Sequence, residues 1–362
     1  MPRTLGVGII GASATRGWAK DSHIPAINGV DGLKLAAVAA GDEKKAQEAK
    51  EAFAAGAGYA SGFDLIKDPA VDIVTVAVKV PDHRELVLAA IAAGKHVYCE
   101  WPLGKNISEA EEMSGAATAA GVRTAIGLQM RSSGAVLNAR KALQEKRIGR
   151  TLSARIVSNT AAFGPDVEPA MQFGEDPANG VTLISIQGAH TFDLAMTVLG
   201  EVKSMSAMTS TQYPQVRIGD DPTLKPRSTS DHVLLMAKFI SGVPVSIEVA
   251  GGRPKDAPTI FEVTGTERTL AIKGGAMRGV QSGRLNWFLD NEAQSVDEST
   301  VASLPDAAAN VAGIYALLRD DILNGTATAP GFEHAVNLAR FVDAVLASPP
   351  NYRLTNIGRP NN

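Results

Sequence analysis

The stretch LGVGIIGASATRGW, residues 5–18, decides the fold of this 362-residue chain. Its first six residues are apolar or glycine and predict a buried strand. A turn of glycine, serine and threonine separates them from a helical pattern that runs to about residue 29. In a strand–turn–helix unit of this kind, the backbone N–H groups of the turn can hold a phosphate. We therefore expect this strand to open a dinucleotide-binding domain.

The phosphate loop is predicted at residues 11–17 rather than at the formal G-x-G-x-x-G match. That match uses Gly6 and Gly8, which lie inside the predicted strand, whereas the glycines that matter in such a unit lie at the turn. An ordinary glycine–serine turn is the alternative interpretation. The predicted cofactor contacts of the loop are Gly11, Ser13, Ala14, Thr15, Arg16, Gly17 and the following Trp18.

Strands and helices alternate through the first third of the chain. Strands are expected at residues 5–10, 33–39, 73–78, 96–99 and 124–128, with helices at 43–55, 82–93 and 108–120. Such alternation is typical of parallel βαβ units. It predicts an α/β domain with a doubly wound parallel sheet over residues 1–130.

The second part of the chain, residues 131–362, has a different pattern. Short β-rich runs at 153–157, 202–208, 232–239, 243–249, 259–264 and 270–273 predict an open, mostly antiparallel sheet in an α+β domain. One helix, at 182–199, interrupts these runs. Helices at 307–324 and 333–347 close the chain and are free to pack back on the first domain. The polar segments 163–180 and 210–230 are predicted to be irregular loops, which in compact domains are usually functional or mobile.

Composition and charge argue against several classes of protein. The net charge is −3 and no sustained basic run is present, so a nucleic-acid partner is not expected. The single cysteine, Cys99, fits a reducing compartment, and the histidines lack metal-ligand spacing. No apolar run is long enough to span a membrane, and the N-terminus enters the first strand without a leader pattern. We therefore expect a cytoplasmic protein without a metal.

The end of the second predicted strand bears on the choice of dinucleotide. An acidic residue usually stands there in NAD-binding proteins and binds the ribose 2′-hydroxyl. This chain has Ala40 and Gly41 instead, so no carboxylate would repel a 2′-phosphate. We expect NADP(H), which Arg16 and Lys44 could pair with. NAD(H) is the alternative if Asp42 takes the usual acidic role from two residues further on.

Two more motifs extend the pattern beyond the loop. Glu100-Trp101-Pro102 follows the strand at 96–99, and Gly188-x-His190-x-x-Asp193 lies on the helix at 182–199. With the loop, they resemble the GFO/IDH/MocA oxidoreductases over nearly the whole chain. Within that family, four stretches are most similar to the galactose-regulon repressor subgroup of yeasts, which binds a nicotinamide dinucleotide but acts as a regulator. They are Gly17-Trp18-Ala19 with His23-Ile24-Pro25-Ala26-Ile27, Glu100-Trp101, Leu128-Gln129-x-Arg131, and Asp231-His232 with Ser241-Gly242-x-Pro244-Val245-Ser246.

The resemblance implies a Rossmann domain and, in catalytic members, a lysine, an aspartate and a histidine around the nicotinamide. Carried over to this chain, these positions hold Trp101, Ile186 and His190. The indole of Trp101 has no positive charge, and the side chain of Ile186 cannot accept or donate a proton. Only His190 is retained, as a general base or as an ordinary core histidine.

Other residues are assigned from their places after strands. Lys79 follows the third long strand, so it is expected near the nicotinamide. There it would either replace the missing lysine in catalysis or bind only ribose or pyrophosphate. Arg131 is a candidate for an interdomain ligand contact or for a surface ion pair. The remaining predicted cofactor contacts are Ala40, Lys79, His83, Glu100, Trp101, Pro102 and Gln129.

These expectations favour an NAD(P)-dependent oxidoreductase that acts on a sugar, cyclitol or related polyol by hydride transfer. Its partner would be a small sugar-like molecule, with neither nucleic acid nor membrane, and it would form a homodimer or homotetramer. A catalytically silent, dinucleotide-binding regulator is the main alternative, because the lysine and the aspartate are lost. A third possibility is a non-redox enzyme that eliminates or deglycosylates through a transient ketone.

Overall fold

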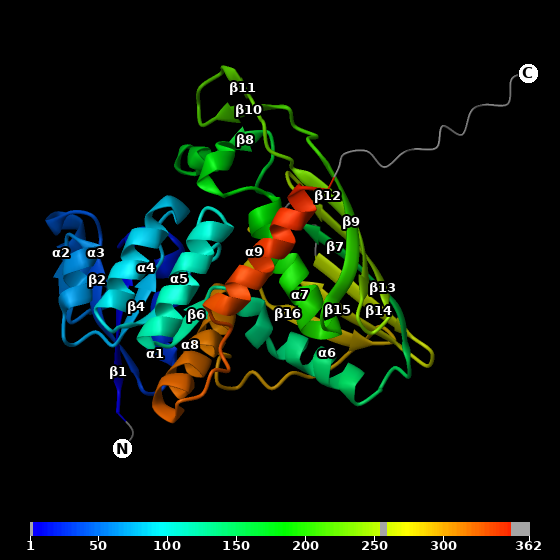
Figure 1. Cartoon of the computed structure of the whole chain (residues 1–362), viewed down its shortest axis with the longest axis horizontal. Coiled ribbons are helices and arrows are strands. Elements are labelled where there is room, and N and C mark those ends of the chain that lie inside the picture. Colours follow the sequence, from blue (N-terminus) through cyan, green and yellow to red (C-terminus); the bar gives the residue numbers. More distant parts are fainter. Residues whose placement is uncertain (1–2, 254–258, 349–362) are drawn as a thin grey trace, which may run out of the picture.

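The computed structural model describes residues 3–253 and 259–348, and its N-terminal part is a six-stranded parallel sheet (Figure 1). The strand order is β3-β2-β1-β4-β5-β6. The strands are β1 (Leu5–Ile10), β2 (Leu33–Ala39), β3 (Ala57–Tyr59), β4 (Ile73–Val76), β5 (His96–Cys99) and β6 (Thr124–Ile126). This is the order of a doubly wound dinucleotide-binding sheet, with its switch point between β1 and β4. The predicted fold class of the first part is confirmed.

Helices cover both faces of this sheet. One face carries η1 (Ala19–His23), α1 (Ile24–Gly29), α2 (Glu43–Phe53) and α8 (Asp306–Asn324). The other face carries α3 (Gly62–Lys67), α4 (His83–Ala92) and α5 (Ile107–Ala120). Although α8 lies near the end of the chain, its Val311 and Tyr315 share one buried cluster with Val7 and Ile9 of β1. A late helix therefore completes the core of the first part, while the division near residue 130 stays a prediction.

The first strand confirms that Gly6 and Gly8 serve packing. A Cβ atom on Gly6 would lie 1.9 Å from the carbonyl oxygen of Ala70, and one on Gly8 would lie 2.7 Å from the side chain of Leu65. Neither position can hold a larger residue without a shift of its neighbours. The formal G-x-G-x-x-G match is therefore a consequence of close packing.

The second part of the chain contains an eight-stranded sheet of order β17-β16-β15-β14-β7-β13-β12-β9. Only β7 and β13 pair in parallel, so the predicted open, mostly antiparallel sheet is confirmed. The strands are β7 (Thr151–Asn159), β9 (Val202–Ser210), β12 (His232–Phe239), β13 (Pro244–Ala250), β14 (Thr259–Gly265), β15 (Thr269–Gly274), β16 (Leu285–Leu289) and β17 (Glu292–Ala293). The predicted outer limits of the two domains, at residues 1 and 362, lie outside the described residues.

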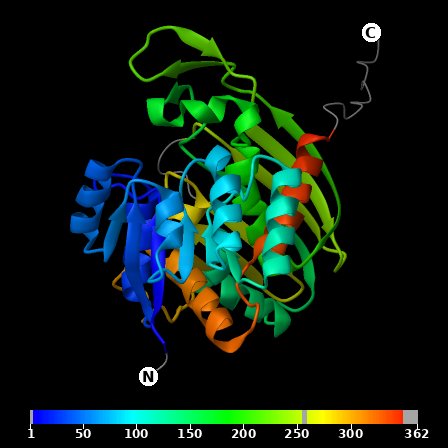
Figure 2. The same cartoon turned by 60° about the vertical axis from the view of Figure 1, so that its left-hand side comes forward.

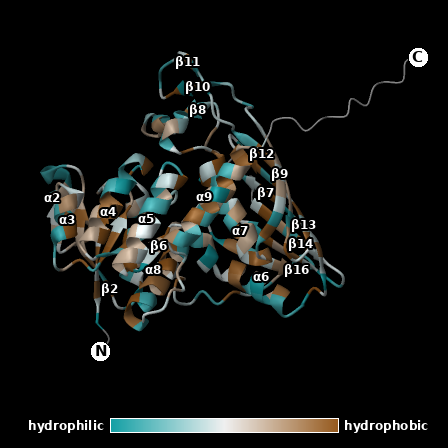
Figure 3. Cartoon of the chain, viewed as in Figure 1, coloured by the Kyte–Doolittle hydropathy of each residue, from teal (hydrophilic) through white to brown (hydrophobic). Residues whose placement is uncertain are grey.

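The inner face of the large sheet is covered by α6 (Gly134–Gln144) and α7 (Ala189–Leu199). Between α7 and α5 lies α9 (Phe332–Leu346), which joins the two parts of the molecule (Figure 1). The helices α6 and α9 carry hydrophobic and hydrophilic residues along their length, as expected for helices that pack on one side (Figure 3), whereas α7 is buried over most of its surface. The outer face of the large sheet exposes the apolar side chains of Val157, Met208, Leu234 and Met236.

Both segments predicted to be irregular loops contain structure, so that prediction is wrong. Residues 163–180 hold β8 (Asp166–Val167), η4 (Pro169–Glu175) and η5 (Pro177–Asn179), and residues 210–230 hold β10 (Gln215–Ile218) and β11 (Leu224–Pro226). The three strands form a small sheet that stands apart from the large one (Figure 2). Only Val167, Val216 and Ile218 form its core, so the surrounding polar composition hid the strands. We refer to residues 163–180 and 210–230 together as the cap.

The helices differ from the prediction in three places, one of which is the unpredicted α3. The helix expected at 182–199 is divided into the π-helical turn η6 (Ile184–Gly188) and α7. The helix α6 was not predicted, although its buried residues Ala135, Val136, Ala139 and Ala142 follow a helical spacing. π-helical turns occur often at functional sites, and here both η1 and η6 border the ends of the parallel strands.

Candidate dinucleotide and substrate site

The loop after β1 presents free backbone donors to solvent. Gly11 and Gly17 have φ values of +99° and +104°, which L-residues with side chains rarely adopt. In the described part of the chain, the amide N–H groups of Ser13, Ala14, Thr15 and Arg16 have no hydrogen-bond partner. Four unpaired donors at the carboxyl end of a parallel strand form a suitable cradle for a pyrophosphate. The indole Nε1 of Trp18, which follows the loop, is buried without a partner as well.

The end of β2 contains no free carboxylate. Ala40 is half-buried, and Gly41 is exposed with a φ of +80°. Asp42 caps α2 by accepting a hydrogen bond from the backbone N–H of Lys45, and its carboxylate lies 2.6 Å from the Lys45 ammonium. This double contact lowers the pKa of Asp42, chiefly through the side-chain hydrogen bond from Lys45. Asp42 therefore has a structural role that competes with ribose binding.

Lys79 and His83, which both follow β4, differ in their exposure to solvent. Lys79 is exposed, and its ammonium stands 4.7 Å from the centre of the Phe173 ring, so the cap touches the edge of the parallel sheet here. His83 is 1% exposed, and its ring nitrogens lie 2.9 Å from the carbonyl oxygen of Pro102 and 3.1 Å from that of Val78. With both nitrogens at backbone oxygens, His83 orients the turn at Pro102 and has no free atom for a dinucleotide.

Trp101 occupies the wall of the site. The Trp101–Pro102 peptide bond is cis. The indole is 7% exposed, and its Nε1 donates a hydrogen bond of 2.6 Å to the carbonyl oxygen of Ser185 in η6. Trp101 and Ser185 also line a cavity of about 370 Å³ between the start of α5 and α9. Neither His190 nor Lys79 lines this cavity.

Glu100 belongs to a buried hydrogen-bonded chain that the sequence did not predict. Its Oε1 lies 3.0 Å from Nε2 of His23, whose Nδ1 lies 2.9 Å from the hydroxyl of Tyr315. That hydroxyl lies 2.8 Å from Oγ1 of Thr75. The chain links η1, β5, α8 and β4, so it binds the late helix to the end of the parallel sheet.

His190, the retained histidine, is 5% exposed, and its Nδ1 has no hydrogen-bond partner. Burial lowers the pKa of His190 to about 4, against the opposing influence of the Glu100 and Asp193 charges. The ring is therefore neutral at pH 7 and can accept a proton. Ile186, at the position of the family's aspartate, is half-buried one helical turn before it.

Amide side chains surround the same region. Gln129 and Gln281 are buried, and each has a side-chain oxygen without a partner. They are linked because Nε2 of Gln129 donates to the backbone oxygen of Gln281. Asn310 of α8 has an unpaired Nδ2 as well. Because buried polar atoms are nearly always hydrogen-bonded, such a group of unpaired atoms is expected where a polar ligand or water binds. With the free amides of the loop, this donor and acceptor set fits a nicotinamide dinucleotide and a hydroxylated substrate.

Arg131 has a structural role rather than a free one. Its guanidinium donates to Oδ1 of Asp193 at 2.8 Å, and Nε2 of His334 lies 2.7 Å from the same oxygen. Asp193 is 1% exposed, so this contact balances a buried charge. Of the two roles considered for Arg131, the structure favours the ion pair.

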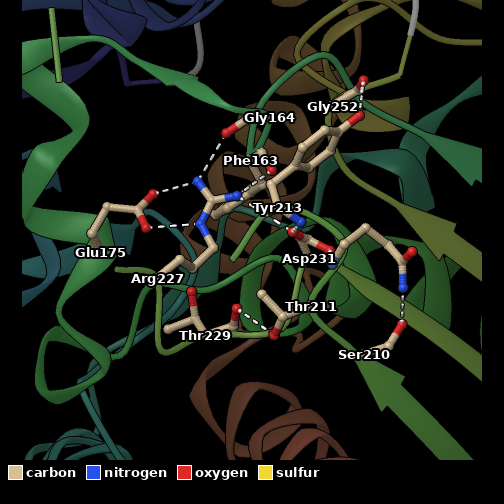
Figure 4. Close-up of polar contacts among 11 residues, drawn as sticks. Phe163, Gly164, Glu175, Ser210, Thr211, Tyr213, Arg227, Thr229, Asp231 and Gly252 are labelled. Carbon is tan, nitrogen blue, oxygen red and sulfur yellow. Dashed lines mark hydrogen bonds and ion pairs between the residues drawn. The ribbon is translucent and has the colours of Figure 1, made fainter. Parts of the chain in front are cut away.

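The cap is fastened by a second buried cation (Figure 4). Arg227 donates two hydrogen bonds to the carboxylate of Glu175, at 2.9 and 2.7 Å, and two more to the carbonyl oxygens of Phe163 and Gly164. Asp231 stands 3.5 Å away and accepts from two backbone N–H groups of the cap. Arg227 thus holds both halves of the cap in one arrangement, and no local sequence signal identified it.

Other kinds of chemistry have little support in the described residues. Within residues 3–253 and 259–348, no three His, Cys, Asp or Glu side chains are arranged to hold a metal ion. None of the helices in that same part is both long and apolar enough to cross a bilayer. Burial raises the pKa of the Cys99 thiol well above its usual value, so it is a poor nucleophile.

Fold and site together define a nicotinamide-dinucleotide-binding protein with a Rossmann domain and a second, sheet-based domain. Two family models match the chain: "Oxidoreductase family, NAD-binding Rossmann fold" over residues 5–128 and "Gal80p, C-terminal domain" over residues 134–274. A 1,5-anhydro-D-fructose reductase of Ensifer adhaerens is 33% identical over 73% of this chain and 74% of its own length. The chain belongs to the GFO/IDH/MocA oxidoreductase family.

Other relatives include both a dehydrogenase and a regulatory protein. A dehydrogenase of Aspergillus oryzae, aclE, is 34% identical over 61% of this chain. The galactose/lactose metabolism regulatory protein GAL80 of Saccharomyces cerevisiae is 26% identical over 75% of it. The matches span 62% and 67% of those two proteins. Among solved structures, a super-repressor mutant of Gal80p has a TM-score of 0.85 at 22% identity, with 95% of each chain covered, which shows the shared fold.

Proposed function

We propose that this protein is an NAD(P)-dependent oxidoreductase that transfers a hydride between the nicotinamide and a sugar, cyclitol or related polyol. The observation that carries the proposal is His190, a buried and neutral histidine with an unpaired ring nitrogen. The segments that carry Gln129 and Gln281 contact the helix of His190, and both glutamines have unpaired amide oxygens that suit hydroxyl groups. When bound, the dinucleotide would supply the hydride acceptor or donor.

Different residues of this chain would bind the dinucleotide, orient the substrate and transfer the proton. The loop amides of Gly11–Gly17 would hold the pyrophosphate, and Trp18, Ala40 and Glu100 would border the ribose and nicotinamide halves. Gln129 would orient the bound ligand, and His190 would take the proton from the substrate hydroxyl. Lys79 would bind ribose or substrate from the cap side, since its only described partner is the Phe173 ring. We propose a preference for NADP(H), which the occupied carboxylate of Asp42 supports.

The substrate class is proposed from the relatives. Several that match are named for cyclic polyols or sugars: levoglucosan dehydrogenase, inositol 2-dehydrogenase 2 and D-apiose dehydrogenase. Neutral amides around His190 suit uncharged, hydroxylated substrates rather than carboxylates. We also propose a cytoplasmic homodimer or homotetramer, supported by the exposed apolar side chains on the outer face of the large sheet.

A second candidate is a dinucleotide-binding regulator with a protein partner. The observation that favours it is the hydrogen bond from Trp101 to Ser185. This bond uses the only polar atom of the Trp101 side chain, and Trp101 occupies the position at which the resemblance implies a lysine. Together with Ile186, this removes two of the three groups that the resemblance implies for catalysis.

One experiment separates the two candidates. Purified protein is loaded with NADP⁺ or NAD⁺ and mixed with a panel of hexoses, anhydrosugars and inositols, while the reduced-nicotinamide absorbance is followed. Turnover that His190→Ala abolishes supports the oxidoreductase. If no member of the panel reacts, but Trp101→Lys with Ile186→Asp creates activity, the regulator is favoured.

A further inference from the structure

The cavity beside Trp101 is lined by the cap, the start of α5 and α9, and the proposed function assigns it no ligand. Its volume of about 370 Å³ is within the range of small-molecule pockets, roughly 300–1,000 Å³. Trp101 and Pro102 are its only lining residues that are also predicted dinucleotide contacts, and none of the loop residues 11–17 lines it. The cavity therefore adjoins the candidate site through the turn after β5 and has room for a ligand of its own.

Apolar side chains form much of the cavity wall. Trp101 and Leu103 come from the turn after β5, Ile107 from the start of α5, and Val342 and Leu346 from the end of α9. Trp101 and Leu103 are buried, whereas Leu346 is 47% exposed, so the wall reaches from the core to solvent. An apolar wall in a concave site favours a ligand with an apolar body, and a rigid ring loses little conformational entropy when it binds.

The cap contributes hydroxyl groups to the same cavity. Ser228, Thr229 and Ser230 line it consecutively. Thr229 is 6% exposed and its backbone oxygen accepts from Thr211, but in the described ranges its own Oγ1 has no hydrogen-bond partner. Arg227, whose contacts Figure 4 shows, fixes the start of this segment. Because buried hydroxyl groups are nearly always hydrogen-bonded, Thr229 is suited to a polar group of a ligand.

One charge at the cavity is left unbalanced. The ammonium of Lys105 lies 3.3 Å from the carboxylate of Glu109, so this pair is neutral overall. Asp343 is exposed on the last turn of α9, and no cationic side chain in the described part of the chain pairs with it, since the ion pairs of α9 use His334 and Arg340. The carbonyl groups at a helix C-terminus add partial negative charge at the same place. The cavity therefore favours a cation over an anion.

We propose that this cavity binds a small organic cation of the aralkylamine class, with an apolar ring, a hydroxyl group and a protonated amine. The ring packs against the apolar wall, the hydroxyl group bonds to Oγ1 of Thr229, and the ammonium group pairs with Asp343. The indole of Trp101 keeps its hydrogen bond to Ser185 and forms part of the surface on which the ring packs. The inference goes beyond the proposed function and does not depend on it.

Tyramine, a phenol with an aminoethyl chain, is the probe for this site. It is titrated into isotope-labelled protein while the indole N–H signals of the three tryptophans are followed by NMR. The Trp101→Phe protein identifies the Trp101 signal by its absence. That signal should shift to saturation as tyramine binds, because Trp101 lines the cavity, whereas the Trp287 signal should stay fixed.

Two variants test the polar contacts. Thr229→Val keeps the shape of the side chain and should raise the dissociation constant of tyramine about three- to tenfold, the range for one hydrogen bond. Asp343→Asn should raise it about two- to fivefold, as expected for an ion pair near the surface. Thr223→Val, elsewhere on the cap, and Glu333→Gln, at the other end of α9, are the matched controls and should leave it unchanged. Unchanged signals of the other two tryptophans show that a variant is folded.

The ligand is varied in the same way. Phenethylamine, which lacks the hydroxyl group, should bind the native protein more weakly than tyramine but bind Thr229→Val equally well. Hydroxyphenylpropionate, which carries a carboxylate in place of the amine, should not saturate the Trp101 signal.

Four results would overturn the proposal. They are a Trp101 signal that tyramine does not saturate, unchanged tyramine binding in Thr229→Val or Asp343→Asn, and hydroxyphenylpropionate that binds as tightly as tyramine. The fourth is displacement of tyramine by NADP⁺ or NAD⁺, which would place the probe in the dinucleotide site. A sugar panel without turnover would count against the proposed function alone.

Discussion

The indole of Trp101 donates its only hydrogen bond to the backbone oxygen of Ser185, at 2.6 Å. This bond joins the end of β5 to η6 and so connects the two parts of the molecule beside the candidate site. A lysine at this position would instead project a cation into the site. The substitution of lysine by tryptophan therefore exchanges a catalytic group for an interdomain contact.

Trp101→Phe should reduce the free energy of unfolding by more than a change of tryptophan to phenylalanine at another buried position. It leaves the buried Ser185 oxygen without its donor, which costs about 1–3 kcal/mol in addition to the lost volume. Trp287→Phe is the matched control, since that indole is buried but donates only a 3.3 Å hydrogen bond to Ser295. Urea unfolding of both variants measures the difference. Equal losses would mean that the Trp101 bond contributes nothing.

His190→Ala should remove most turnover on any substrate that the panel identifies. The loss of a positioned acid–base group typically costs about 10²- to 10⁴-fold in rate. The affinity for the dinucleotide, measured by fluorescence titration, should change little. His232→Ala, on the outer face of the large sheet, should leave both quantities unchanged. Full turnover in His190→Ala would show that another group carries the proton.

Acid should destabilise the protein partly through His190. Because burial lowers its folded-state pKa to about 4, the unfolded chain, with an ordinary histidine pKa, binds the proton first as the pH falls. Stability from this group is complete above about pH 6.5 and is lost as the pH falls toward 4. Urea unfolding gives the free energy of unfolding at pH 7 and at pH 4.5, and the value should be lower at pH 4.5. This decrease should be about 2–3 kcal/mol smaller in His190→Gln than in the native protein. An unchanged difference would contradict the assigned pKa.

Ala40→Asp should shift the dinucleotide preference toward NAD(H). The new carboxylate would accept from a ribose 2′-hydroxyl and repel a 2′-phosphate. Titration of native and variant protein with NADPH and NADH measures the ratio of dissociation constants. Ala40→Asn, which adds a side chain of similar volume without the charge, is the control. Strong selectivity of the native protein for NADH would contradict the proposed preference.

Met236→Lys should weaken self-association. Met236 is 58% exposed on β12, next to the edge strand β9, and Leu234 lies two residues before it on the same outer face of the large sheet. A lysine there would place a charge in a self-complementary apolar contact. Light scattering at micromolar concentration should give a dimer or tetramer for the native chain and a smaller species for the variant. Met277→Lys, an equally simple change away from the sheet, is the control. A monomeric native protein would remove the basis for this prediction.

Local patterns were sufficient for five of the six strands of the parallel sheet. Alternating apolar runs located β1, β2 and β5 to the residue, whereas β3 and α3 are short and were not predicted. Contacts between distant residues could not be predicted in the same way. His23 and Tyr315 are 292 positions apart, and Arg227 reaches Glu175 across 52 positions. A lone histidine or arginine carries no signal for such partners, because only the fold brings them together.

The structure of the cap could not be predicted from the sequence for a different reason. Its strands are short and polar, and Arg227 joins the two halves of the cap through Glu175, Phe163 and Gly164. Composition alone therefore predicted irregular structure. The roles of Asp42 and Arg131 were open for a similar reason, since a carboxylate or a guanidinium suits both ligands and ion pairs until its neighbours are known.

The packing of α8 on the parallel sheet has a consequence for biosynthesis. Val311 and Tyr315 complete a buried cluster with residues of β1 that leave the ribosome some 300 positions earlier. Until the last sixth of the chain is made, the first-made sheet has one apolar face incompletely covered and Glu100 lacks part of its support. The first half of the nascent chain must therefore remain open to rearrangement, or be shielded by a chaperone, while the second half is translated.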